Sequence, residues 1–133
     1  MKTAILVDGG FYTRRAQKVF GDISAKDRAT ELVNYCKRHL NSHGENNDLY
    51  RIFYYDCPPT SKRIYHPFLQ KQIILISGDS DFVSAAKLAR REGIDFILDP
   101  LGAPIKPDLF EHIDGLRTCD KAYTQNVTAI HKK

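Results

Sequence analysis

The sequence predicts an α/β protein whose central, mainly parallel sheet is covered by helices on both faces, a three-layer α/β/α sandwich. Two observations lead to this prediction. Short runs of β-forming residues alternate along the chain with segments of helical periodicity, the pattern of a parallel sheet with helical crossovers. In addition, residues Ile73–Ile76 are apolar at every position, as in a strand covered on both faces.

The length and composition fit one soluble domain. The chain has 133 residues, of which 42% are hydrophobic and 27% are charged, the balance of a globular protein with a real core. No apolar run approaches the roughly 18 residues of a membrane span, and the N-terminus lacks the long apolar stretch of a signal peptide. We therefore expect a cytoplasmic protein with no membrane partner. A homo-oligomer is compatible with the sequence.

Charge and cysteine content constrain the function only weakly. The formal net charge is +4, which allows a polyanionic partner without requiring one. Cys36, Cys57 and Cys119 are widely spaced and form no CxxC pair, so neither a zinc site nor a disulfide framework is indicated. Cys36 is expected in the core. Four histidines do not have the spacing of metal ligands and are expected at the surface or in loops: His39, His43, His66 and His112.

In the first half of the chain the clearest element is a helix that follows Ser24. Ser24 is a good N-cap, Asp27 is placed to complete a capping box, and apolar residues then recur with helical spacing up to Leu40. The other expected elements are a strand at 3–7, a helix at 11–20 that Gly21 ends, a loop at 41–48 and a strand at 50–56.

The second half is expected to contain two strands and two helices. The strand at 73–76 leads into a helix at about 82–91, closed by Gly93. Residues 94–100 form a further strand and residues 106–113 a short helix. The domain is expected to span residues 1–119, because residues 120–133 are polar and aperiodic and predict a disordered tail.

The connection between Asp56 and Gln72 does not fit this plan. A parallel crossover usually carries a helix, but "CPPTSKRIYHPFLQK" contains three prolines and has no helical period. We expect either an unusually short crossover around residues 57–72 or the absence of a segment there.

Every apolar run ends in an aspartate: Asp8, Asp56, Asp79 and Asp99. The carboxyl ends of parallel strands share one edge of the sheet, where open α/β folds bind ligands. If the first strand and the strand at 73–76 are central neighbours, Asp8, Asp79 and Asp81 share one cleft. Three carboxylates make an oxygen-only site suited to Mg²⁺ or Mn²⁺.

Other roles for these aspartates remain open. Asp81 could equally cap the helix that follows it. Asp56 and Asp99 each precede a turn, which favours turn formation over metal binding, and Asp99 is kept as a further candidate ligand.

Glycines and basic residues accompany the aspartates. Gly9, Gly10 and Gly78 remove side-chain bulk where a phosphate backbone could approach. Tyr12 could stack on a base or pack in the core. The candidates for phosphate contacts in a nucleic-acid complex are Arg14, Arg15, Lys87 and Arg90, although solvated helix faces commonly carry such residues.

The stretches "AILVDGGFY", "RIFYYD", "ILISGDSDFVSAAKLARREG" and "IDFILDP" resemble the NYN domain of LabA-like bacterial proteins, a branch of the PIN-like nuclease superfamily. The resemblance covers roughly residues 3–118, and SGDSDF with its helix is the most specific part. It implies a PIN-like α/β/α sandwich and metal-dependent RNA cleavage. Asp8, Asp79 and Asp81 would then be the catalytic, metal-binding acids.

The chain departs from this family at two places. Gly10-Phe11-Tyr12 stand where many members have an asparagine shortly after the first aspartate. The acid-bearing strand edge and helix that members carry before the SGDSDF strand have no counterpart here.

Three functions compete on this basis. The first is a Mg²⁺- or Mn²⁺-dependent ribonuclease acting on single-stranded RNA, in which the metal activates a water molecule. The second is a non-catalytic RNA-binding or scaffolding module that has lost part of the acid set. The third is a phosphatase of the haloacid-dehalogenase type, because "DSDFV" at 79–83 matches D-x-D-x-[TV], although such enzymes carry that motif after their first strand.

Overall fold

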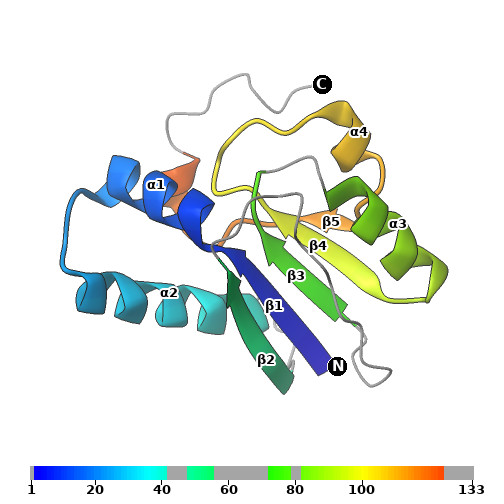
Figure 1. The fold of residues 1–133 in the computed structure, drawn as a ribbon, viewed down its shortest axis with the longest axis horizontal. Coiled ribbons are helices and arrows are strands. Elements are labelled where there is room, and N and C mark those ends of the chain that lie inside the picture. The colour runs from blue at the N-terminus through cyan, green and yellow to red at the C-terminus, as the bar shows by residue number, and fades with distance from the viewer. Residues whose placement is uncertain (1, 42–47, 56–71, 79–81, 125–133) are drawn as a thin grey trace.

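The structure is a computed structural model that describes residues 2–41, 48–55, 72–78 and 82–124. Helices pack on both faces of a central sheet, which confirms the predicted three-layer α/β/α sandwich (Figure 1). The elements, in chain order, are β1 (Lys2–Asp8), α1 (Gly9–Phe20), α2 (Ala25–Leu40), β2 (Asp48–Tyr55), β3 (Gln72–Ile76), α3 (Val83–Arg91), β4 (Asp95–Asp99), α4 (Pro107–Phe110), β5 (Gly115–Leu116) and the 3-10 helix η4 (Lys121–Tyr123).

The five described strands form one parallel sheet in the order β2-β1-β3-β4-β5. β1 and β3 are central neighbours, the condition on which the predicted cleft depends, and Val7 pairs with Ile76 near their carboxyl ends. The chain adds β2 on one side of β1 and the later strands on the other side. The strand order therefore reverses between β1 and β3, and open α/β sheets bind ligands outside the carboxyl ends of the strands at such a point.

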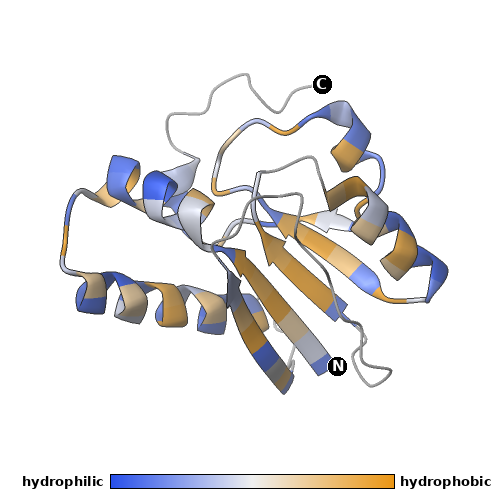
Figure 2. Ribbon diagram, viewed as in Figure 1, coloured by the Kyte–Doolittle hydropathy of each residue, from blue (hydrophilic) through white to orange (hydrophobic). Residues whose placement is uncertain are grey.

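The sheet buries both of its faces, because successive side chains of a strand point to opposite sides. The apolar colouring of the central strands reflects this double burial (Figure 2). One core layer joins alternate strand residues to α3 and α4: Ala4, Leu6, Ile73, Leu75, Phe96, Leu98, Phe82, Ala86, Ala89 and Leu109. The other joins the intervening residues to α1 and α2: Ile5, Val7, Ile74, Ile76, Tyr12, Ala16, Leu32, Tyr35 and Cys36.

α1 and α2, the helices of the second core layer, each begin after a residue whose side chain caps the helix. Ser24 Oγ accepts a hydrogen bond from the Asp27 amide at 3.1 Å, so the predicted N-cap of α2 is confirmed. α1 begins at Gly9, two residues before the predicted Phe11, because Asp8 Oδ1 accepts a hydrogen bond from the Phe11 amide at 3.2 Å. None of the described helices combines the length and the apolar character that a membrane span requires.

The prediction of a disordered tail is wrong for residues 120–124. Tyr123 is only 2% exposed and belongs to the core. Its ring packs edge-on against Tyr35 and Phe20, with centroids 5.8 and 5.4 Å away. The domain therefore extends at least to residue 124, and residues 125–133 lie outside the described part of the chain.

The predicted crossover falls almost entirely outside the described residues, since only Gln72 of the range 57–72 is described, as the first residue of β3. Its length and the absence of a segment there stay predictions. Most other boundaries differ from those expected by one residue, and two differ by more: β2 begins at Asp48 instead of residue 50, and α4 ends at Phe110 instead of residue 113.

Candidate functional site at the carboxyl edge of the sheet

The carboxyl ends of β1 and β3 are joined by side chains. Asp8, half-buried at the end of β1, accepts a hydrogen bond through Oδ2 from the Ser77 hydroxyl at 3.1 Å. Ser77 follows β3 directly and is fully buried. Because Asp8 also caps α1 through Oδ1, two donors fix the orientation of its carboxylate at the reversal of strand order.

The structure does not describe three of the other predicted acids. Asp79 and Asp81 lie outside the described residues, as does Asp56, so a shared cleft with Asp8 stays a prediction. Ser77 and Gly78 are described and immediately precede Asp79 in the chain. The last described residues before the two acids therefore follow the end of β3, where Ser77 is bonded to Asp8.

Two of the three predicted glycines make room for aromatic rings of this chain. A Cβ atom at Gly9 would lie 2.5 Å from the ring of Tyr54, and one at Gly78 would lie 2.8 Å from the ring of Phe11. Gly10 is half-buried in the first turn of α1. Packing is thus a sufficient reason for Gly9 and Gly78, and a phosphate approaching these glycines stays a prediction.

Asp99 has a role that excludes it from a site open to solvent. Its side chain is fully buried, and Oδ1 accepts hydrogen bonds from the Leu101 amide at 2.9 Å and the Thr118 hydroxyl at 3.0 Å. Oδ2 accepts from the Tyr35 hydroxyl and lies 2.7 Å from His39 Nε2. With both oxygens enclosed by donors, Asp99 is a structural anchor, which corrects its assignment as a candidate metal ligand. The bond from Leu101, two residues on, agrees with the turn-forming alternative.

The network around Asp99 also corrects the expectation for His39, which is fully buried on α2. Burial lowers the pKa of His39, but the hydrogen bond to Asp99, the contact with the Cys119 thiol and the attraction of both groups outweigh it and raise the pKa to about 9. Burial and the neighbouring Asp99 raise the pKa of Tyr35. A signal was present in the sequence, since His39 lies three residues after Cys36 and continues the apolar face of α2.

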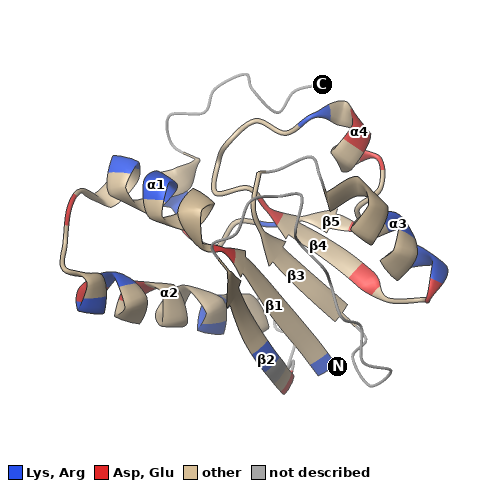
Figure 3. Ribbon diagram, viewed as in Figure 1, with Lys and Arg blue, Asp and Glu red and all other residues tan. Residues whose placement is uncertain are grey.

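The predicted basic residues are dispersed. Arg14 is exposed on α1, whereas Arg15 donates to the Leu101 carbonyl at 3.2 and 3.0 Å through Nε and Nη2. Arg90 contacts Asp114 at 3.4 Å, and Asp114 accepts from the Phe96 amide near the start of β4. Arg90 therefore lies at the amino edge of the sheet, away from Asp8. Lys87 is exposed on the same helix, whose basic residues gather toward the end remote from the strand tips (Figure 3).

Arg117 was not among the predicted residues but lies at the carboxyl edge. Its amide donates to the Leu98 carbonyl at 2.9 Å, directly after β5. The Nε and Nη2 atoms are buried and have no hydrogen-bond partner within the described part of the chain. Burying these two donors without a partner is costly, which favours an acceptor beside Arg117, either from a ligand or from the rest of the chain. Nothing in the spacing of the sequence separates Arg117 from other basic residues.

Two aromatic residues near Asp8 differ in exposure. Tyr12 is buried, and its hydroxyl donates to Glu31 Oε1, so the base-stacking alternative for Tyr12 is wrong. Tyr54 is 53% exposed and lies beside Gly9. Tyr54 also lines a largely apolar groove of about 640 Å³ between α1, α2 and β2, together with Ile23 and Val33.

One other group of potential metal ligands occurs among the described residues: Asp108, Glu111 and His112, with ligand atoms within 4.8 Å of one another. The two acids are exposed, and His112 Nδ1 is already 2.8 Å from the Asp108 carbonyl. Exposed acidic groups of this kind are common without an ion.

The fold and this edge define an open, parallel α/β protein with a carboxylate at its reversal of strand order. Comparisons with protein-family models, with curated proteins and with solved structures each found no match.

Proposed function

We propose that this chain is a metal-dependent ribonuclease that hydrolyses RNA phosphodiester bonds at the carboxyl edge of β1 and β3. One observation carries the proposal: the strand order reverses between β1 and β3, and Asp8 and Ser77 are hydrogen-bonded at that point. The chain continues from Ser77 into Gly78-Asp79-Ser80-Asp81, which brings two further carboxylates into the same sequence neighbourhood. The resemblance to NYN domains supports the same reading.

The donor set fits Mg²⁺ or Mn²⁺, because Asp8, Asp79 and Asp81 offer carboxylate oxygens, the ligands that these hard cations prefer. When bound, such an ion lowers the pKa of a water molecule and offsets charge on the scissile phosphate. The Phe11 amide and the Ser77 hydroxyl hold the Asp8 carboxylate in one orientation. This fixed orientation is what Asp8 itself contributes to the site.

Arg117 and Tyr54 supply contacts for the RNA strand in this proposal. β5 is three strands from β1, on the order of 14 Å at about 4.8 Å per strand. Arg117 is half-buried, and its charge could attract a phosphate away from the one that is cleaved. Tyr54, half-exposed beside Gly9, offers a ring face for base stacking. Both residues take over roles that the sequence assigned to Arg90 and Tyr12.

A non-catalytic RNA-binding module is the second candidate function. It is favoured by the commitment of Asp99 to buried donors and of Arg15 to the Leu101 carbonyl. Both commitments leave fewer groups for chemistry at the carboxyl edge.

The test is cleavage and binding of one single-stranded RNA, with Mn²⁺ and with a chelator. Asp79→Asn should abolish Mn²⁺-dependent cleavage and preserve binding, while Asp95→Asn, the same change on an exposed residue at the amino edge, should leave both unchanged. Arg117→Ala should weaken RNA binding, and exposed Arg91→Ala should not. Equal cleavage by wild type and Asp79→Asn would overturn the metal site. If the wild type and the variants bind the RNA and none of them cleaves it, the result would favour the non-catalytic RNA-binding module.

A further inference from the structure

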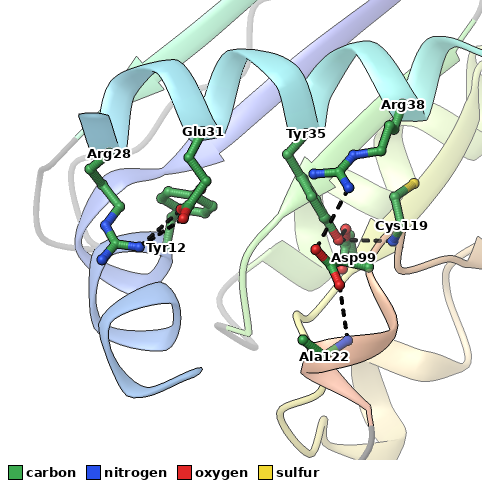
Figure 4. Close-up of polar contacts among 9 residues, drawn as sticks. Tyr12, Arg28, Glu31, Tyr35, Arg38, Asp99, Cys119 and Ala122 are labelled. Atoms are coloured by element: carbon green, nitrogen blue, oxygen red, sulfur yellow. Dashed lines mark hydrogen bonds and ion pairs between the residues drawn. The ribbon is translucent and has the colours of Figure 1, made fainter. Parts of the chain in front are cut away.

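A carboxylate, an imidazole and a thiol meet on the α2 side of the sheet, apart from the site at Asp8. Asp99 lies at the end of β4, His39 on α2, and Cys119 in the segment between β5 and η4. Figure 4 shows Tyr35, Asp99 and Cys119 converging below α2, with the Cys119 sulfur turned toward that helix. Three segments that are distant in sequence therefore bring a nucleophilic group beside a buried ion pair.

Two hydrogen bonds, from Cys119 and from the residue before it, hold Cys119 in place. The Cys119 amide donates to the Tyr35 hydroxyl at 2.9 Å. The preceding residue, Thr118, donates its hydroxyl to Asp99 Oδ1 at 3.0 Å. Cys119 is thus fixed by the same two residues that surround the carboxylate of Asp99.

The imidazole of His39 connects the carboxylate with the thiol. Nε2 lies 2.7 Å from Asp99 Oδ2, which leaves Nδ1 as the nitrogen available to another group. Nδ1 is buried and makes no hydrogen bond within ordinary distance limits. The Cys119 side chain is nevertheless close enough to contribute to the raised pKa of His39. A loose contact of this kind is common between a nucleophile and its base before a reactant is present.

The two described cysteines differ in access. Cys36 is 1% exposed, and burial together with the charge of Asp99 raises its pKa to about 12, so it is an inert thiol. Cys119 is half-buried, so part of this residue is open to solvent. Reactive cysteines are typically partly exposed and adjacent to a protonated histidine, and only Cys119 meets both conditions among the described residues.

We propose that Cys119 is a reactive thiol that small hydroperoxides oxidise, with His39 as its proton partner and Asp99 as the residue that positions His39. The thiolate form of Cys119, beside the imidazolium of His39, attacks the terminal peroxide oxygen. An S–O bond forms and the O–O bond breaks, so sulfur loses two electrons and the peroxide gains them. The departing alkoxide takes the proton from His39, which yields an alcohol, or water from hydrogen peroxide, and Cys119 sulfenic acid.

The experiment uses hydrogen peroxide with dimedone as the trap for sulfenic acid, and mass spectrometry to locate the label. A Cys57→Ser background leaves Cys36 and Cys119 as the two thiols. Cys119 in the folded protein should be labelled at least about tenfold faster than Cys119 in the same chain unfolded in urea, and Cys36 should stay unlabelled while the protein is folded. Equal rates in the folded and unfolded chain would overturn the proposal.

A variant separates the role of His39 from simple exposure of the thiol. His39→Gln, with its fold verified by circular dichroism, should reduce labelling of Cys119 to the rate of the unfolded chain. Unchanged labelling in the folded variant would exclude His39 as the proton partner. If His39→Gln does not fold, Thr118→Val takes its place: it removes one hydrogen bond to Asp99, keeps His39, and should slow labelling by a smaller factor. Undiminished labelling there would count against positioning through Asp99.

Discussion

Asp8 and Asp99 end two strands of one parallel sheet at the same edge, yet they sit in opposite environments. Asp8 is half-buried and bound by a helix amide and the Ser77 hydroxyl. Asp99 is fully buried, and four donors from α2, the following turn and Thr118 surround it. The difference teaches that a strand-end aspartate is available for chemistry only where the layers on either side leave it uncovered. Position at a strand end does not distinguish the two cases.

The largest effect is expected from removing the buried carboxylate. Asp99→Ala leaves His39, Tyr35 and Thr118 without their common acceptor, and breaking such a buried pair should lower the free energy of unfolding by about 3–5 kcal/mol. Urea denaturation measures the change. Asp95→Ala, at the exposed start of the same strand, is the matched control and should stay within about 0.5 kcal/mol of wild type. A loss below about 1 kcal/mol for Asp99→Ala would contradict the anchoring role.

A somewhat smaller effect should follow from pH, through His39. Its pKa is raised to about 9 in the folded protein and is about 6.5 when unfolded, so the folded state binds the proton more tightly. The resulting stability is fully present below pH 6.5 and is lost as pH rises through 9, a total of about 3 kcal/mol. Urea midpoints measured between pH 6 and pH 10 should fall over this window. A flat profile would mean that His39 is neutral beside Asp99.

The smallest change in stability is expected at Asp8, the less buried of the two strand-end aspartates. Asp8→Asn keeps an acceptor for the Phe11 amide and should cost at most about 1 kcal/mol. The same substitution should abolish the rise in melting temperature that millimolar Mn²⁺ gives the wild type, since an ion that binds only the native state stabilises it. Asp95→Asn should retain that rise. Loss of the Mn²⁺ effect in Asp95→Asn as well would place the ion elsewhere.

The sequence predicts the layers of this fold because each layer has a local signal. The apolar run at 73–76 and the spacing of Leu32, Cys36 and Leu40 depend only on neighbours in the chain, and the Ser24 cap is likewise local. The position of β1 beside β3 was a condition of the predicted cleft, and the sheet order satisfies it. These features are therefore correct in the prediction.

The contacts and the burial of individual side chains were less predictable, because they depend on residues that are distant in the sequence. The partners of Asp99 on α2 are 60 and 64 residues away, and no local pattern links His39 or Tyr35 to it. Tyr123 is one aromatic residue in a polar segment, which carries no periodicity although the ring is buried. Arg90 was associated with Asp79 by sequence distance, but α3 carries it to the other edge of the sheet.

The long sequence separations around Asp99 also bear on the order of folding. Its side chain joins residues of α2 to the end of β4, and the Tyr35 hydroxyl reaches the Cys119 amide across 84 residues. Such contacts form only after the entropy of closing large loops has been overcome, so they belong to the slow, late events of folding. In a nascent chain that stops before residue 118, the carboxylate of Asp99 still lacks one of its four donors, because Thr118 has not been added. Completion of the polar network therefore marks the moment at which the last segment docks.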